Sequence, residues 1–127
     1  DAARWHYRYL QHPTQSYVLL VLRQFLTGRP LAAMALREHP THCEWLDYVG
    51  PQQGIELAVL AVREWDGAKG KPVTALVSDS VAALFSAQAE TVHPSQIQIP
   101  VNAPPGQTTA PPWAGRFWFM GGDTDFL

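Results

Sequence analysis

Hydrophobic residues recur at three- and four-residue steps along much of the chain between residues 12 and 94. The clearest run covers residues 55–65, where apolar positions share one side and Glu56, Arg63 and Glu64 occupy the other. That spacing is typical of an amphipathic helix. Prolines and glycines divide the remaining sequence into short segments, and proline in a first turn with glycine after the last is the usual helix asymmetry. The pattern therefore predicts a series of short helices.

Four further helices are predicted around this one. The first covers residues 17–27 after Thr14 or Ser16 as a cap, and the others cover residues 30–38, 40–49 and 72–85. The connections between them are short, which favours antiparallel neighbours. The five helices are expected to form a compact bundle.

Three segments alternate as strands do. In residues 4–10 Trp5, Tyr7 and Tyr9 fall on one side of an extended chain, and residues 97–101 and 116–120 also suit short strands. Pairing between these segments would bring the two ends of the chain together. The predicted fold class is therefore mainly α, five short helices in a compact bundle, with a few short β-strands at the two ends, that is, α+β.

The C-terminal part of the chain has a different composition. Residues 103–112 are rich in proline and have linker chemistry, and five of the chain's fourteen aromatic residues follow them. The predicted organisation is a helical body, residues 1–102, and a Pro-rich linker with an aromatic arm, residues 103–127. Aromatic and arginine side chains dominate interface hot spots, which makes the arm the predicted binding element. Its predicted binding residues are Trp113, Arg116, Phe117, Trp118, Phe119 and Phe126.

Composition and charge narrow the classes of function. The chain of 127 residues is 46% hydrophobic and 16% charged, which fits one globular domain. The net charge of −2 conceals five arginines within residues 1–37 and an acidic excess in residues 38–127. Neither part has the density of basic residues that phosphate recognition requires, so nucleic acid is not an expected partner. The two oppositely charged parts could instead attract one another or a second copy.

The single cysteine and the short apolar runs bear on location. Cys43 cannot form an intrachain disulfide, so a cytosolic location is slightly favoured. The longest apolar stretch, residues 17–22, is far shorter than the roughly 20 residues that span a bilayer. No membrane span is therefore expected.

One cluster of possible metal ligands occurs, at His39, His42, Cys43 and Glu44. Structural zinc sites usually draw on two separated ligand pairs, and no second pair is present. The favoured interpretation is that the histidines flank a helix start and that Cys43 is a small buried residue. A Cys43 nucleophile with a histidine base is a weaker alternative. No cofactor or metal is predicted.

Two other motifs are weak. Residues 67–72 lack the serine or threonine and the glycine spacing of a phosphate loop, and are interpreted as a solvated turn. Asp123 and Asp125 offer too few oxygens for a calcium site. Separately, Arg63-Glu64-Trp65 and the later run Phe117 to Gly122 resemble motifs of uncharacterised helical proteins associated with bacterial type VI secretion. The spacing between the two motifs differs, and no function follows from the resemblance.

The sequence favours a non-enzymatic protein–protein interaction module, such as an adaptor, assembly or accessory subunit. The C-terminal arm is expected to dock either on the same domain or on a partner, which is another protein or a second copy. Binding of a second copy through the arm would give a homo-oligomer. Two alternatives stay open. One is a small metal-dependent or Cys/His hydrolase, and the other is a small-ligand binder with an aromatic pocket. The residues considered for that pocket are Trp5, Tyr7, Tyr9, Trp65 and Trp118.

Overall fold

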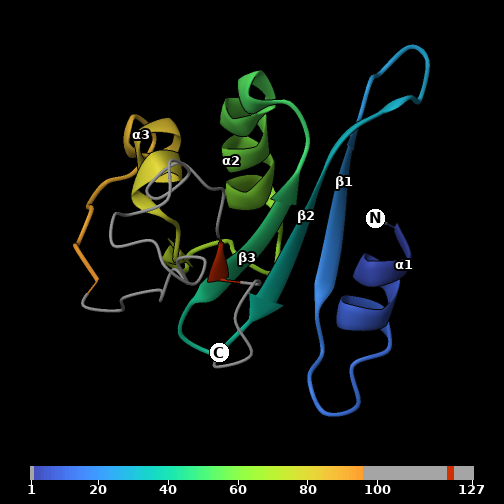
Figure 1. Ribbon diagram of the computed structural model, residues 1–127, viewed down its shortest axis with the longest axis horizontal. Coiled ribbons are helices and arrows are strands. Elements are labelled where there is room, and N and C mark those ends of the chain that lie inside the picture. Colours follow the sequence, from blue (N-terminus) through green and yellow to red (C-terminus); the bar gives the residue numbers. More distant parts are fainter. Residues whose placement is uncertain (1, 96–119, 122–127) are drawn as a thin grey trace, which may run out of the picture.

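The computed structural model describes residues 2–95, 120 and 121. In this part of the chain a four-stranded mixed sheet carries helices on both of its faces (Figure 1). The strand order is β1–β2–β3–β4, with antiparallel pairing among the first three strands and parallel pairing between β3 and β4. The elements are α1 (Ala2–Trp5), η1 (His6–Leu10), β1 (Val18–Arg23), β2 (Pro30–Glu38), β3 (Cys43–Val49), η2 (Gln52–Gly54), α2 (Ile55–Glu64), β4 (Val73–Ala75) and α3 (Asp79–Ser86).

The predicted fold class is wrong, because a mixed sheet and not a helical bundle organises the described residues. Three segments predicted as helices, residues 17–27, 30–38 and 40–49, contain the strands β1, β2 and β3. The helix predicted over residues 55–65 is present as α2. Its buried residues are Ile55, Ala58, Val59 and Val62, the apolar side read from the sequence.

Strand β2 illustrates how tertiary packing overrides local preference. Its alanine, leucine, methionine, arginine and glutamate residues are strong helix formers. The strand is nevertheless central, with β1 hydrogen-bonded on one side and β3 on the other. Met34 and Leu36 are fully buried on one face, and Ala35 is fully buried on the other. Burial on both faces outweighs propensity differences of a few tenths of a kcal/mol per residue.

Strand β3 contains a β-bulge that hides its alternation. Leu36 pairs with Trp45 and Ala35 pairs with Asp47, so Leu46 is an extra residue in the ladder. Leu46 packs against Tyr9, and Asp47 accepts a hydrogen bond from the same tyrosine. The consecutive residues Leu46 and Asp47 therefore both contact Tyr9. The sequence of β3 thus lacks the period of two by which a strand is recognised.

The N-terminal strand predicted over residues 4–10 is also wrong. The segment is helical, α1 followed by the π-helix η1. Trp5 and Tyr9 are four residues apart and meet edge to face at 5.3 Å between ring centroids, whereas the Tyr7 side chain is 75% exposed. The alternation of aromatics thus does not reflect a strand, and the expected pairing of an N-terminal strand with the C-terminal segment is absent from the described residues.

The helix predicted over residues 72–85 is two elements. Residues 73–75 form β4 beside β3, and α3 begins at Asp79. Ser78, with φ −69° and ψ 157°, has extended backbone and occupies the N-cap position of α3. The run Ser78-Asp79 is a helix-start signal of the usual type.

Two hydrophobic clusters lie on opposite faces of the sheet. The larger cluster joins β2, β3 and α2 through residues that include Met34, Leu36, Trp45 and Ile55. The smaller cluster joins Tyr9 of η1 to Ala35 and Leu46. In Figure 1, α2 and α3 lie on the opposite side of the strands from α1. The two central strands, β2 and β3, are thus buried on both faces.

One residue of the C-terminal segment, Met120, belongs to the larger cluster. Met120 is fully buried and forms an isolated antiparallel bridge with Val77 (red segment in Figure 1). The strand predicted over residues 97–101 lies outside the described residues, as do most of the predicted arm and all but Met120 of the strand predicted over residues 116–120. Met120 shows that the chain returns to the body after the Pro-rich run.

Candidate functional site

A cluster of polar residues occupies the end of the sheet where β2 turns into β3. The turn is closed by the amide of His39, which donates to the carbonyl oxygen of His42 over 2.9 Å. Arg37 and Glu44 are directly paired on the two strands. Since alternate residues of a strand share a face, the register brings His39 beside Arg37 and His42 beside Glu44. We call Arg37, His39, His42 and Glu44 the turn cluster.

The carboxylate of Glu44 contacts both Arg37 and His39 within the turn cluster. Its Oε2 accepts a hydrogen bond from Nε of Arg37 at 2.7 Å and lies 2.6 Å from Nη2 of the same side chain. The same oxygen is 2.7 Å from Nε2 of His39. Burial alone raises the pKa of Glu44, but the hydrogen bonds from His39 and Arg37 and the charge of Arg37 outweigh it. The net pKa lies below the ordinary value of a glutamate.

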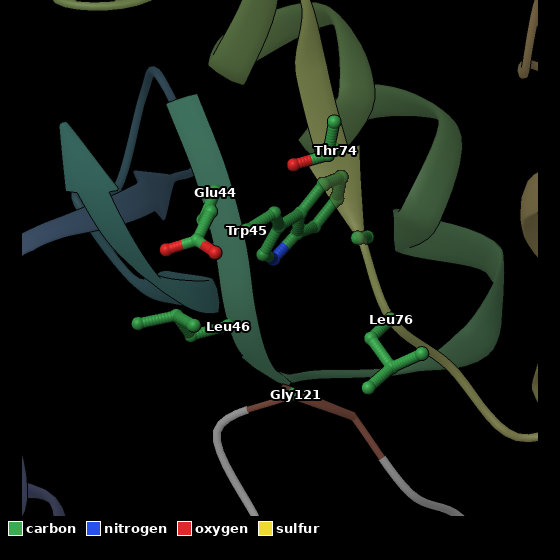
Figure 2. A pocket seen from close by; sticks show the side chains of 7 residues that line it. Glu44, Trp45, Leu46, Thr74, Leu76 and Gly121 are labelled. Atoms are coloured by element: carbon green, nitrogen blue, oxygen red, sulfur yellow. The ribbon is translucent and has the colours of Figure 1, made fainter. Parts of the chain in front are cut away.

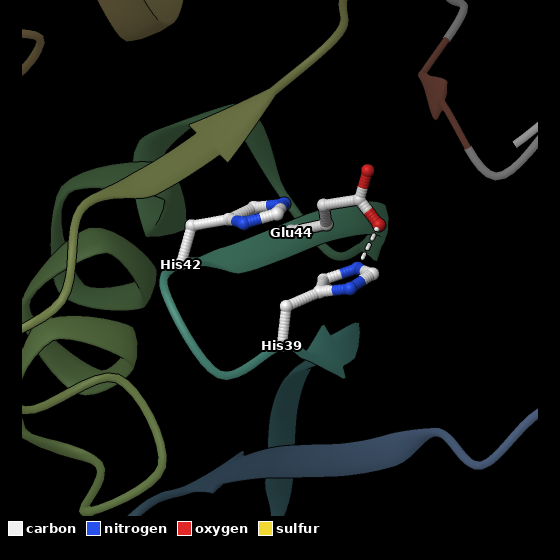
Figure 3. Close-up of side chains that lie close together, drawn as sticks. All are labelled: His39, His42 and Glu44. Carbon is white, nitrogen blue, oxygen red and sulfur yellow. Dashed lines mark hydrogen bonds and ion pairs between the residues drawn. The ribbon is translucent and has the colours of Figure 1, made fainter.

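The two imidazoles of the turn cluster are stacked. Their centroids are 4.3 Å apart and their planes differ by 5°. Figure 3 shows the rings one above the other, with the Glu44 carboxylate at the edge of the stack. The ligand-type atoms of His39, His42 and Glu44 all lie within 4.8 Å of one another. Two imidazoles and a carboxylate are a donor set used by zinc.

Cys43 is not part of this cluster. Its thiol is fully buried in the larger hydrophobic cluster, on the opposite face of β3 from the carboxylate of Glu44. Burial raises the pKa of the Cys43 thiol above its ordinary value, and the nearby charge of Glu38 raises it further. A thiol in this setting is a poor nucleophile. The prediction that Cys43 is a small buried residue fits this position, although it lies in a strand and not in a helix.

A small hollow of about 180 Å³ lies between β3 and the segment that contains β4 (Figure 2). Its volume is below the roughly 300–1,000 Å³ of typical ligand pockets. It is lined by Glu44, Trp45, Leu46, Thr74, Ala75, Leu76 and Gly121. A second hollow of about 400 Å³ is more open to solvent and is lined by Ser16, Val18, Glu38, His39, Pro40 and Lys71. Neither is an enclosed pocket for a small molecule.

The aromatic residues considered for a ligand pocket do not gather in one place. Trp5 and Tyr9 pack on the face of the smaller cluster, whereas Trp65 packs against the larger cluster on the other face. Tyr7 points into solvent. Trp118 lies outside the described residues.

A second functional candidate is the loop between β1 and β2, which overlaps the end of the helix predicted over residues 17–27. Phe25 and Leu26 at its apex are 98% and 87% exposed. The sequence signal was available, since Phe25-Leu26 sits between the polar residues Gln24 and Thr27 with Gly28 next. The helix predicted over residues 17–27 places both of them on its apolar faces instead. We call residues 24–29 the hairpin tip.

Residues 67–72 form the turn between α2 and β4, not an interhelical turn. Nζ of Lys71 lies 2.7 Å from Oε1 of Glu38 and donates to the carbonyl oxygen of His39 over 3.0 Å. Lys71 therefore fixes the β2–β3 turn to the start of β4. A lysine with these partners is not presented to a phosphate group, which agrees with the interpretation as a turn.

The predicted binding residues of the arm lie outside the described residues: Trp113, Arg116, Phe117, Trp118, Phe119 and Phe126. The same holds for Asp123 and Asp125. Among the residues that are described, no helix has the length and apolar character needed to cross a membrane. Comparisons with protein-family models, with curated proteins and with solved structures gave no match.

Proposed function

We propose that the protein is a non-enzymatic module that binds another protein, and that the hairpin tip is its contact element. The observation that carries this proposal is the exposure of Phe25 and Leu26, two large apolar side chains in sequence at the apex of a hairpin. Isolated exposed apolar residues are common and need no explanation. Two adjacent apolar side chains that are almost fully exposed at a protruding loop lower the solubility of the protein and do not stabilise its fold. Their exposure therefore favours a role in binding a partner.

The hairpin tip is held in one conformation by its own hydrogen bonds. The Gln24 amide donates to the Arg29 carbonyl and the Gly28 amide donates to the Gln24 carbonyl, each over 2.8 Å. The Thr27 hydroxyl donates to Oε1 of Gln24 over 2.8 Å. Such order reduces the entropy lost when the tip is bound. Phe25 and Leu26 are therefore presented by a pre-organised loop.

The residues around the apex indicate the chemistry of the partner. Arg23 precedes the tip and Arg29 is its last residue, and Nη1 of Arg23 donates to the carbonyl oxygen of Gly28 over 3.1 Å. An aromatic anchor with arginines at its rim is a typical composition of an interface hot spot. The complementary surface is an apolar groove with acidic residues at its edge. Strand β1 is at the edge of the sheet as described, so partner backbone could also extend the sheet there.

The C-terminal aromatic residues stay a second predicted contact element of the same module. Arg116, Phe117 and Trp118 have the residue types expected of one. Met120, which belongs to the predicted arm, is buried against the body.

A crosslinking experiment followed by an affinity measurement tests the proposal. A photoreactive phenylalanine analogue at position 25 of the full chain captures the neighbouring protein in a lysate of the cells that produce it. The captured protein is then purified, and its affinity is measured for the wild type and for Phe25→Ser/Leu26→Ser. We expect the double variant to bind at least about tenfold more weakly, as hot-spot residues do.

The matched control is Leu57→Ser/Leu60→Ser on α2, whose side chains are 56% and 55% exposed. It removes the same kind of apolar surface elsewhere and should leave the affinity unchanged. Equal affinity for the wild type and the tip variant would contradict the proposal. Binding of the wild type to anionic lipid vesicles, lost in the tip variant, would instead assign the tip to a membrane surface. Light scattering of the wild type shows whether the partner is a second copy.

A further inference from the structure

The turn cluster brings together three side chains of metal-binding type. His39 and His42 flank a turn of two residues, and Glu44 follows on the same face of β3. We propose that His39, His42 and Glu44 form a binding site for one divalent transition-metal ion, Zn²⁺ being the ion that the donor set suits best. This site is independent of the hairpin tip and goes beyond the proposed binding of a protein.

The distances require only a change of side-chain rotamers. Zinc binds imidazole nitrogen and carboxylate oxygen at about 2.0–2.2 Å, so tetrahedral ligands are roughly 3.4 Å from one another. The three candidate ligand atoms already lie within 4.8 Å of one another. The backbone on which they stand is fixed by the turn hydrogen bond between His39 and His42. Small rotations of the side chains are therefore enough to close the remaining gap.

The imidazole stack must open when an ion binds. Two parallel rings cannot both direct a ring nitrogen in plane at one ion, so the planes of His39 and His42 must tilt from their present 5°. His39 must also release Oε2 of Glu44, from which its Nε2 is 2.7 Å away. In the metal-free form, a hydrogen bond and a ring stack fix the three side chains. Bonds to the ion would replace both interactions.

Arg37 has the position of a residue that orients the carboxylate. Both of its contacts are to Oε2 of Glu44, and in the described residues the other oxygen, Oε1, has no hydrogen bond. Rotation of its carboxylate would let Glu44 keep its pair with Arg37 through Oε2 and turn Oε1 toward an ion. Hydrogen-bonded second partners of this kind hold ligating carboxylates in place. The positive charge of Arg37 also opposes a cation, which keeps the affinity moderate.

The donor set selects the class of ion and the site is accessible. Nitrogen donors favour zinc and neighbouring transition metals over calcium and magnesium, which prefer oxygen ligands. The side chains of His39 and Glu44 are 31% and 21% exposed, so an ion can enter from solvent. With three protein ligands, a fourth position stays open to water.

Titration of the metal-free full chain with Zn²⁺ by calorimetry tests this site, and Co²⁺ provides a visible spectrum of its coordination. We expect one ion per chain. His39→Gln, His42→Gln and Glu44→Gln should each weaken binding at least about tenfold. His93→Gln is the matched control, because His93 is exposed and outside the cluster, and it should bind as the wild type does. Binding should also weaken on acidification, since imidazole ligands must be deprotonated.

A measurement on the unaltered protein covers the case in which a variant fails to fold. Proton and nitrogen NMR of the imidazoles should show Zn²⁺-dependent shifts of His39 and His42 and none of His93. The proposal is overturned if Zn²⁺ does not bind, if it binds equally to the His39 and His42 variants, or if it shifts the other histidines instead.

Discussion

Arg37 and Glu44 face each other across β2 and β3, and Nη2 of the arginine is 2.6 Å from Oε2 of the glutamate. The side chain of Arg37 is only 10% exposed and that of Glu44 is 21% exposed. A guanidinium this deeply buried depends on its partner, because an unpaired buried charge is costly. The pair therefore binds together the strands that carry the turn cluster.

Glu44→Gln should lower the free energy of unfolding by about 2–4 kcal/mol, because it leaves the Arg37 charge buried without its counterion. The double change Arg37→Met/Glu44→Leu should recover most of that loss, since it replaces the pair by apolar groups of similar size. Urea denaturation of the three proteins at neutral pH measures both effects. A double variant as unstable as Glu44→Gln would show that the ion pair itself, and not the avoidance of an unpaired charge, stabilises the turn.

The lowered pKa of Glu44 makes this contribution dependent on pH. The folded state holds the carboxylate ionised more strongly than the unfolded state does, so near pH 4 the unfolded chain binds more protons. The contribution is present above the unfolded value of 4.5 and is lost as the pH falls through the lower folded value. The difference in stability between wild type and Glu44→Gln should therefore shrink below about pH 4.5.

Urea denaturation between pH 3 and pH 7 follows this difference. Glu90→Gln is the control, because its side chain is 90% exposed and should give no comparable dependence on pH. A difference between wild type and Glu44→Gln that stays constant down to pH 3 would be incompatible with the lowered pKa.

Tyr9 packs the N-terminal helical segment against the sheet as a member of the smaller cluster. Its ring meets those of Trp5 and Tyr17, each at 5.3 Å between centroids, and its hydroxyl donates to Oδ2 of Asp47 over 3.2 Å. Tyr9→Phe should cost about 1 kcal/mol, the value of one hydrogen bond, and Tyr9→Ala about 3–5 kcal/mol. Thermal unfolding with hydrogen exchange of residues 2–10 measures both. A loss below 1 kcal/mol for Tyr9→Ala would mean that this segment is not part of the folded core.

Local patterns predicted one element of the described fold well and misassigned several others. Helix α2 was predictable because it is exposed on one side, so its residues repeat at helical steps. The β1 run of consecutive apolar residues has no period, since both faces of the strand contact other side chains, and such runs suit a helix as well as a strand. Strand β2 is made of helix formers and is fixed by its two neighbours, which a local pattern does not contain.

The residue types of the candidate site could be predicted from the sequence, but their arrangement could not. The sequence indicates His39, His42 and Glu44 as possible ligands, but the predicted helix over residues 40–49 groups them with Cys43. In a strand Cys43 turns to the opposite face, and the histidines meet because they flank a tight turn. Recognising Pro40-Thr41 as a hairpin loop would have placed Arg37 opposite Glu44. The hairpin tip could not be predicted for a similar reason, because Phe25 and Leu26 fit the apolar faces of the helix predicted over residues 17–27.

Gly28 and Gly70 offer a matched pair for separating stability from binding at the hairpin tip. Both have positive φ, 67° and 73°, and a methyl group at either would meet nothing within 4 Å. Alanine at either position should therefore cost only backbone strain, about 1–2 kcal/mol. We expect similar losses of stability for Gly28→Ala and Gly70→Ala, measured by urea denaturation. Gly28→Ala alone should weaken partner binding, because it loosens the loop that presents Phe25 and Leu26, and equal affinities would show that the order of the tip does not contribute to recognition.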